Sequence, residues 1–293
     1  MIKIGLYTRG IKEIDIPYFL RFVETLQEHK FQILFHHHLK ELPQEQRVFE
    51  NIEFIDPQQD LAAQIDYLLT FGGDGTILDA VLLVKDSQIP ILGINTGRLG
   101  FLTSYNKNEI DLVINALKHD NFIIDSRTLL RLESSSGIFG KNNYALNDFT
   151  IRRNDNSTLI TVHTYLNDEF LTSYWADGII VATPTGSTGY SLSCGGPIII
   201  PQSGNFVITP VSPHNLTVRP IVLSDAHTLK FTVQGRSPDF LCTLDSRTAH
   251  INPEETLKVS RQSFSTNFVR PKNYSFLQTL RNKLMWGADT RQY

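Results

Sequence analysis

A glycine-rich turn that directly follows a short apolar run constrains the fold of this chain more than any other feature. The apolar run covers residues 65–70, the turn reads Phe71-Gly72-Gly73-Asp74-Gly75-Thr76, and a second, largely apolar segment covers residues 77–84. A short apolar run that ends in glycines and continues into such a segment is typical of a buried strand, a tight turn and a helix. We therefore predict a strand–turn–helix unit here.

The same turn is a candidate phosphate-binding site. Its glycines let the backbone approach a ligand closely, and the helix that follows offers free N–H groups and a positive dipole end to an anion. Asp74 adds a negative charge that a site for phosphate alone would avoid. We interpret Asp74 as a base beside a hydroxyl group or as a ligand of a metal ion that bridges phosphates, with a simple helix cap as the alternative. The candidate residues of this turn are Gly72, Gly73, Asp74, Gly75 and Thr76.

A second glycine-rich segment follows the next apolar run, residues 91–94. It reads Asn95-Thr96-Gly97-Arg98-Leu99-Gly100-Phe101-Leu102. Turns at the carboxyl ends of neighbouring strands in an open α/β sheet converge on one crevice, where ligands bind. Phe101 is a candidate for stacking on a base, with core packing as the alternative. Arg98 is a candidate partner of a phosphate, with a plain surface charge as the alternative.

A third segment, residues 183–197, is crowded with hydroxyl groups and glycines, and it follows the apolar run of residues 179–182. Hydroxyl groups and free backbone groups suit a ligand with many hydrogen-bonding edges, such as an adenine or a ribose. Asn147, Asp148 and Asp177 could hold ribose hydroxyls or could serve as turn residues. The candidates in the hydroxyl-rich segment are Thr185, Thr188, Gly189, Tyr190, Ser191, Leu192 and Ser193.

The pattern of apolar runs changes near residue 125. Before it, strand and helix signals alternate, which indicates a parallel sheet covered on both faces. After it, short β-rich runs such as residues 143–152 are separated by polar turns, which is typical of an all-β domain. We predict an α/β domain with a parallel sheet at residues 1–125, an all-β domain at residues 126–274, and a C-terminal helix at residues 275–293 that packs on the first domain.

Composition limits the partners. The 293 residues suffice for two domains, and a net charge of −3 gives no broad basic surface, so we expect no nucleic-acid partner. No apolar stretch approaches the length of a membrane span, and the N-terminus lacks the apolar core of a signal peptide. The two cysteines, Cys194 and Cys242, lack metal-site spacing. We expect a soluble, cytoplasmic protein without a membrane partner.

Taken in order and spacing, these motifs closely resemble those of the NAD kinases, although the first motif alone is shared with diacylglycerol and sphingosine kinases. The resemblance implies a two-domain NAD kinase-like fold. It also implies transfer of the γ-phosphoryl group of ATP to the 2′-hydroxyl of the adenosine ribose of NAD, assisted by Mg²⁺ or another divalent cation. The motifs that carry the resemblance are residues 72–76, 95–102, 147–148 and 183–190.

The resemblance also implies roles for single residues. Asp74 would be the catalytic base, Asn147 and Asp148 would hold the ribose of the substrate, and residues 188–193 would line its adenosine pocket, with Phe101 against the adenine. The family further suggests a homo-oligomer, a dimer or a tetramer. Bacterial members often have Asp-Gly-Gln where this chain has Asp245-Ser246-Arg247. Asp245 and Arg247 are therefore candidate site residues whose detailed roles are open, and Arg247 could reach a phosphate.

Two alternatives remain at this stage. A lipid kinase of the diacylglycerol or sphingosine type would need an apolar channel, whereas residues 174–197 read as a polar nucleoside pocket. A non-catalytic dinucleotide-binding regulator would gain nothing from a carboxylate beside phosphates. The sequence leaves open the preference for NAD or NADH, the range of phosphoryl donors, the metal ligands and any allosteric control.

Overall fold

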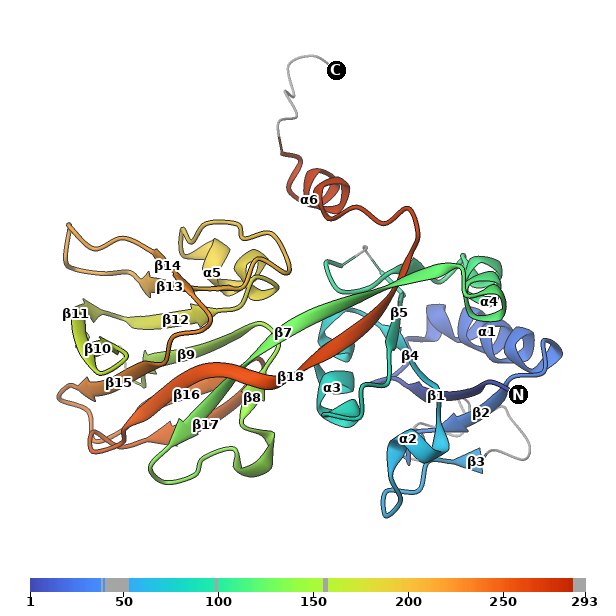
Figure 1. Cartoon of the computed structure of the whole chain (residues 1–293), viewed down its shortest axis with the longest axis horizontal. Helices are drawn as coiled ribbons and strands as arrows, with labels where there is room; N and C mark the ends of the chain where they lie inside the picture. The colour runs from blue at the N-terminus through green and yellow to red at the C-terminus, as the bar shows by residue number, and fades with distance from the viewer. Residues whose placement is uncertain (38, 40–52, 98–99, 155–157, 287–293) are drawn as a thin grey trace. The chain divides into compact units, whose positions relative to one another are not determined.

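A computed structural model describes residues 1–37, 39, 53–97, 100–154 and 158–286. The chain divides into two compact units, which are described separately (Figure 1). The first unit comprises residues 1–126 and 266–293, and the second comprises residues 127–265. Residues 266–274, which the sequence analysis assigned to the second domain, are part of the first of these two units. Arg98 and Leu99 lie outside the described residues.

A parallel sheet forms the centre of the first unit. Its strand order is β18-β5-β4-β1-β2-β3, with β6 beside β5, and the neighbouring strands run parallel. Strands of such a sheet are covered on both faces and read as continuous apolar runs. The strands are β1 (Lys3–Tyr7), β2 (Gln32–Phe35), β3 (Glu53–Phe54), β4 (Tyr67–Gly72), β5 (Ile91–Asn95), β6 (Tyr105–Asn106) and the last part of β18 (Leu257–Pro271).

Helices pack on this sheet through apolar side chains at helical spacing. Phe19 and Val23 of the first long helix and Val113 of a later one share one core with strand residues such as Leu69. The predicted α/β domain with a parallel sheet is therefore confirmed. The helices of the first part of the chain are α1 (Ile16–Glu28), preceded by the short η1 (Glu13–Asp15), then α2 (Leu61–Gln64), α3 (Asp74–Val84) and α4 (Ile110–His119). The predicted C-terminal helix is present as α6 (Phe276–Leu284), while residues 287–293 lie outside the described residues. Packing of this helix on the first domain stays a prediction.

Two groups of β-strands form the second unit. One sheet has the order β14-β13-β12-β9-β16-β17, and another group has the order β11-β10-β15 followed by the first part of β18; these neighbours are antiparallel. β7 (Phe122–Ser134) carries the chain from the first unit into the second and pairs with β8 (Tyr144–Ala145). The predicted all-β domain is confirmed. The remaining strands are β9 (Asp148–Arg153), β10 (Ile160–Leu166), β11 (Glu169–Ala176), β12 (Gly178–Ala182), β13 (Asn205–Val211), β14 (Ile221–Ser224), β15 (Leu229–Gln234), β16 (Phe240–Leu244) and β17 (Arg247–Ile251).

The short helical turns of the second unit all lie in its connecting segments. They are η4 (Gly140–Asn142), η5 (Gly186–Thr188) and α5 (Tyr190–Ser193), and the last two follow the buried strand β12. The hydroxyl-rich segment therefore begins where a buried strand ends. Among the described residues, no helix is long and apolar enough to cross a membrane.

Candidate active site

The Asp74 carboxylate joins the two glycine-rich segments of the first unit. β4 ends at Gly72, and Asp74 begins α3. The two carboxylate oxygens accept hydrogen bonds from the backbone N–H groups of Phe101 (2.8 Å), Leu102 (3.1 Å) and Thr103 (3.3 Å). A carboxylate offers about four lone-pair positions, so these three bonds leave room for one further donor. Convergence of the two turns, expected from the order of their strands, is thus present in the structure.

Close packing keeps the second glycine-rich segment against Asp74. A Cβ atom on Gly100 would lie 1.7 Å from Oδ1 of Asp74, so only glycine fits there. The buried Thr103 hydroxyl accepts hydrogen bonds from Asn95 Nδ2 (2.9 Å) and from the Gly100 N–H (3.0 Å). Arg270, whose side chain is fully buried, donates to the Leu102 carbonyl at 2.8 Å. The segment is therefore bonded through both its amide and its carbonyl groups.

Glycines also shape the first turn. A Cβ atom on Gly72 would lie 2.2 Å from the hydroxyl of Thr76, a side chain that is buried. A Cβ atom on Gly75 would lie 2.9 Å from the guanidinium of Arg9, which forms an ion pair with Asp79. Gly72 therefore has a packing reason beside any role in ligand binding, whereas the flexible end of the Arg9 side chain could move away from a Cβ atom on Gly75.

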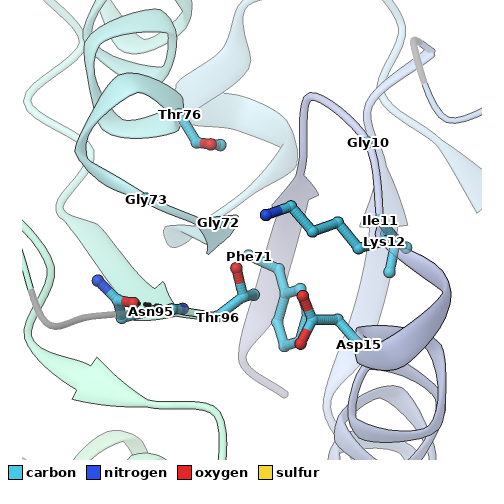
Figure 2. Close-up of a pocket in the computed structure, with 11 residues that line it drawn as sticks. Gly10, Ile11, Lys12, Asp15, Phe71, Gly72, Gly73, Thr76, Asn95 and Thr96 are labelled. Carbon is cyan, nitrogen blue, oxygen red and sulfur yellow. Dashed lines mark hydrogen bonds between the residues drawn. The ribbon is translucent and has the colours of Figure 1, made fainter.

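A cavity of about 370 Å³ opens beside this turn (Figure 2). The sequence analysis missed one wall of it, the segment of residues 10–15 that follows β1. In Figure 2 the Lys12 side chain extends from this wall toward the glycine turn. β1 is the direct neighbour of β4, so the rule that strand ends converge could have identified this segment. The lining residues are Gly10, Ile11, Lys12, Asp15, Phe71, Gly72, Gly73, Thr76, Asn95, Thr96 and Gly97.

Among the described residues that line this cavity, Lys12 is the single cation. Within the described part of the chain, its exposed ammonium group makes no ion pair or side-chain hydrogen bond. The Lys12 carbonyl accepts a hydrogen bond from the N–H of the buried Asp15 (2.8 Å), whose carboxylate pairs with Lys107 at 2.6 Å. The cavity therefore combines glycine turns, a helix N-terminus and one available positive charge, which together suit a phosphate group.

In the second unit, Asn147 and Asp148 lie on a backbone segment that is bonded on two sides. Asp245 accepts hydrogen bonds from the N–H groups of Leu146 (3.0 Å), Asn147 (2.8 Å) and Asp148 (3.2 Å). Thr183 donates from its hydroxyl to the Leu146 carbonyl (2.5 Å) and from its N–H to the Asn147 carbonyl (2.9 Å). The side chains of Asn147 and Asp148 themselves make no hydrogen bond to any residue that the structure describes. They are available to a ligand.

The electrostatic setting of Asp148 is unusual for a carboxylate. The side chain is buried, and burial together with the nearby Asp245 charge raises the pKa of Asp148 from 3.8 to about 7. Burial also raises the pKa of Asp245, against the effect of its three amide donors. Near neutral pH, Asp148 can therefore either accept a hydrogen bond as a carboxylate or donate one as an acid.

Several hydroxyl groups of the hydroxyl-rich segment already have partners within the protein. Thr185 accepts from Arg127 (3.2 Å), Thr188 donates to the Thr185 carbonyl (3.2 Å), and Ser191 bonds to Thr209 (2.8 Å). The part left exposed consists of Gly189, Tyr190 and Ser193, with Leu192 half-buried. The Tyr190 ring is 38% exposed, which leaves a face on which a base could stack.

Two other predicted site residues already have protein partners. Asp177 pairs with Arg153 at 2.9 Å. Arg247 donates hydrogen bonds to the carbonyls of Asn142 and Tyr144. It stays a prediction that Asp177 contacts a ribose and that Arg247 contacts a phosphate. The roles assigned to the other site residues also stay predictions.

Comparison with known proteins assigns the chain to a family. Residues 4–122 match the family model of the ATP-NAD kinase N-terminal domain, and residues 146–271 match that of the ATP-NAD kinase C-terminal domain. A protein of Cytophaga hutchinsonii named NAD kinase is 42% identical over 295 residues, which cover 98% of this chain and 99% of that protein. The chain belongs to the NAD kinase family. An NAD kinase of Flavobacterium psychrophilum is 40% identical and covers 99% of this chain, with 100% of its own length matched.

Solved structures of NAD kinase family members share the fold. A yeast NADH kinase crystallised with NADH has a TM-score of 0.90 at 22% identity, covering 100% of this chain and 90% of that one. An NAD kinase of Archaeoglobus fulgidus crystallised with ATP has a TM-score of 0.74 at 22% identity, covering 97% of this chain and 99% of that one. The predicted family, the two-domain fold and the prediction that this NAD kinase family member is an enzyme are confirmed.

Proposed function

We propose that the protein transfers the γ-phosphoryl group of ATP to the 2′-hydroxyl of the adenosine ribose of NAD, giving NADP and ADP. The observation that carries this proposal is the match of both NAD kinase domain models, in order, to one chain. The relatives at 40–42% identity over nearly their whole length are named NAD kinases. A lipid kinase and a non-catalytic regulator are not favoured.

Asp74 serves as the base in this proposal. The bond between the ribose O2′ and the γ-phosphorus forms, the bond between that phosphorus and the β–γ bridging oxygen breaks, and the hydroxyl proton passes from O2′ to the Asp74 carboxylate. A carboxylate with one free acceptor position can hold and orient that hydroxyl. The three amide donors fix the carboxylate in place, so its orientation needs no adjustment when substrate binds.

The cavity beside the glycine turn is proposed to receive the phosphates of ATP. Backbone N–H groups at the start of α3 and the Lys12 ammonium supply the positive potential for them. ATP as donor is supported by the description of the matched family and by the ATP complex of the Archaeoglobus fulgidus relative. Asn147 and Asp148 are proposed to bind the ribose of the acceptor, because their side chains are available and carry hydrogen-bonding groups for hydroxyls.

Mg²⁺ fits these residues as an ion that arrives with ATP. No group of three or more His, Cys, Asp or Glu side chains that could hold a metal occurs in the described ranges. Mg²⁺ in kinase sites is often bound by one or two carboxylates together with substrate phosphates and water. Because the free acceptor position of Asp74 is assigned to the ribose hydroxyl, the ion would be held mainly by the phosphates of ATP and by water. When bound, the ion would neutralise charge on the β- and γ-phosphate oxygens.

Product analysis tests the proposal. Purified protein is mixed with ATP, Mg²⁺ and either NAD or NADH, and the products are separated and assayed for NADP and NADPH. Parallel reactions contain vesicles with diacylglycerol, or no acceptor. We expect NADP or NADPH to form together with an equal amount of ADP. Phosphorylated lipid without NADP would contradict the proposal, and so would nucleotide binding without any turnover.

We also propose a cytoplasmic location and a homo-oligomer, a dimer or a tetramer, on the basis of the family resemblance. Light scattering on the purified protein at several concentrations measures the mass of the assembly. A monomer at every concentration, with full activity, would contradict the oligomer.

A further inference from the structure

We propose that Asp245 is a positioning residue that fixes Asn147 and Asp148 for the acceptor ribose and does not itself contact the substrate. This inference rests on the proposed function, which makes Asn147 and Asp148 the ribose-binding pair. As a candidate site residue, Asp245 could be expected to contact the substrate directly. The role proposed here is to hold the residues that do.

The first support is that Asp245 uses both carboxylate oxygens inside the protein. One oxygen accepts from the Leu146 N–H at 3.0 Å, and the other accepts from the N–H groups of Asn147 at 2.8 Å and Asp148 at 3.2 Å. The Asp245 N–H in turn donates to the Asp148 carbonyl at 2.9 Å. Four hydrogen bonds therefore join one residue to three consecutive residues that lie 97–99 positions away in sequence.

The second support is the interruption of the sheet at the segment that Asp245 holds. β8 ends at Ala145 and β9 begins at Asp148, so Leu146 and Asn147 lie between two strands. N–H groups in such a gap need partners, because an unpaired buried backbone donor is costly. Successive N–H groups that point to one side form a concave site for an anion, and here the Asp245 carboxylate occupies it.

The third support comes from the opposite side of the same segment. Thr183 bonds to the carbonyls of Leu146 and Asn147, and a Cβ atom on Gly186 would lie 2.0 Å from the Asn147 carbonyl oxygen. Amide groups are thus held from the Asp245 side and carbonyl groups from the hydroxyl-rich segment. What remains free is the pair of side chains, since neither forms a hydrogen bond within the described ranges. The backbone is fixed while the ligand-binding groups stay available.

The test uses Asp245→Asn in the full-length protein. The asparagine keeps the shape but offers one acceptor oxygen and places an NH₂ group against a backbone donor. We expect the Kd for NAD, measured by calorimetry, to rise about tenfold, as the loss of one hydrogen bond to a charged group implies. The KM for ATP should change less than about twofold, because Lys12 and the glycine turn belong to the other unit. Amide hydrogen exchange without ligand should accelerate at residues 146–148.

Two further variants make the result decisive. Asp225→Asn changes another buried carboxylate of the second unit, one that pairs with Arg261 at 3.3 Å, and should leave exchange at residues 146–148 unchanged. Thr183→Val removes a hydroxyl from the other side and should also weaken NAD binding. Unchanged NAD affinity in folded Asp245→Asn, or an equal rise in the ATP KM, would overturn the proposal.

The same measurements separate this inference from the proposed function. If the unmutated protein neither binds NAD nor forms NADP, the proposed function fails. The exchange measurement needs no ligand, so it still decides whether Asp245 holds residues 146–148. Slow exchange there in both proteins would contradict the positioning role independently of any activity.

Discussion

In each of the two units, a single carboxylate accepts hydrogen bonds from three consecutive backbone amides. Asp74 holds the N–H groups of residues 101–103 in the first unit, and Asp245 holds those of residues 146–148 in the second. In both cases the acid comes from one turn and the amides from another. A charged acceptor makes each such bond stronger than a neutral pair would. Each proposed substrate-binding segment is therefore held by one short acidic side chain.

Replacing Asp74 tests its proposed role as base. Asp74→Asn should lower kcat by about 10²–10⁴-fold, because the amide cannot take a proton. NAD affinity, measured by calorimetry, should stay near that of the unmutated protein, since the proposed ribose pair belongs to the other unit. Asp66→Asn, which changes an exposed carboxylate bonded to the Lys3 N–H, is the matched control. Near-normal turnover in Asp74→Asn would exclude the base role.

Asp148 should make the stability of the protein depend on pH. Its pKa is 3.8 in ordinary surroundings and about 7 when folded, so the folded state holds the proton more tightly. The free energy of unfolding therefore falls as pH rises between these two values, by about 2–3 kcal/mol from pH 5 to pH 8 for this group. Asp148→Asn lacks this contribution. Denaturant unfolding at pH 5 and pH 8 should show the variant gaining stability relative to the unmutated protein at the higher pH, and a pH-independent difference would refute the assignment.

Lys12 should matter for the phosphoryl donor. Lys12→Gln removes the cation of the cavity beside the glycine turn, so the KM for ATP should rise about tenfold, the value of a lost charged hydrogen bond. NAD affinity should not change. Lys85→Gln, at an exposed lysine that ends α3, serves as the control. Equal ATP kinetics in both variants would remove Lys12 from the donor site.

At the scale of elements, glycines set how closely the connecting segments approach one another. Gly186 packs against the Asn147 carbonyl, and an added Cβ atom would lie 2.0 Å from that oxygen. Gly186→Ala should lower the free energy of unfolding by about 1–3 kcal/mol, as overpacking of a dense site does. Gly10→Ala, where no atom lies within 4 Å of the added Cβ, should change stability little. Thermal unfolding of both variants measures the difference.

Elements with a strong local signal were predicted from the sequence. β4 and α3 were predicted to within a few residues from the apolar run, the glycines and the second apolar segment. These signals lie within the elements themselves, because a strand buried on both faces is apolar throughout and the turn residues follow it directly. Short elements such as β3 and α2 were not predicted, since two to four residues show no periodicity. Their places depend on contacts with the rest of the sheet.

The predicted strand at residues 143–152 shows where local reasoning stops. The structure divides it into β8 and β9, and the break at Leu146 and Asn147 is the proposed ribose site. The break exists because Asp245, about a hundred positions away, supplies acceptors for the amide groups. Lys12 was also not predicted as a site residue, because one lysine in a polar segment forms no sequence pattern. The break between β8 and β9 therefore depends on a contact between residues far apart in sequence, which a local pattern does not reveal.

For the whole molecule, the proposed Mg²⁺ should be needed for turnover but not for folding. The described residues include no cluster of side chains able to hold a metal without substrate. Adding EDTA should therefore abolish NADP formation and leave the melting temperature of the ligand-free protein unchanged within about 1 °C, since no binding energy is lost. Excess Mg²⁺ should restore activity. A large drop in melting temperature with EDTA would indicate a resident metal ion instead.

The return of the chain through β18 has a consequence for biosynthesis. Phe268 pairs with Ile91 of β5, and the buried Arg270 bonds to Asp125 at 3.2 Å and to the loop that holds Asp74. A ribosome that has made only the first 126 residues has therefore not yet supplied a strand of the first sheet or the arginine in its core. The second unit, residues 127–265, is continuous in sequence and can complete its own core before residues 266–271 are made. We expect the unit that begins translation to be the last to finish folding.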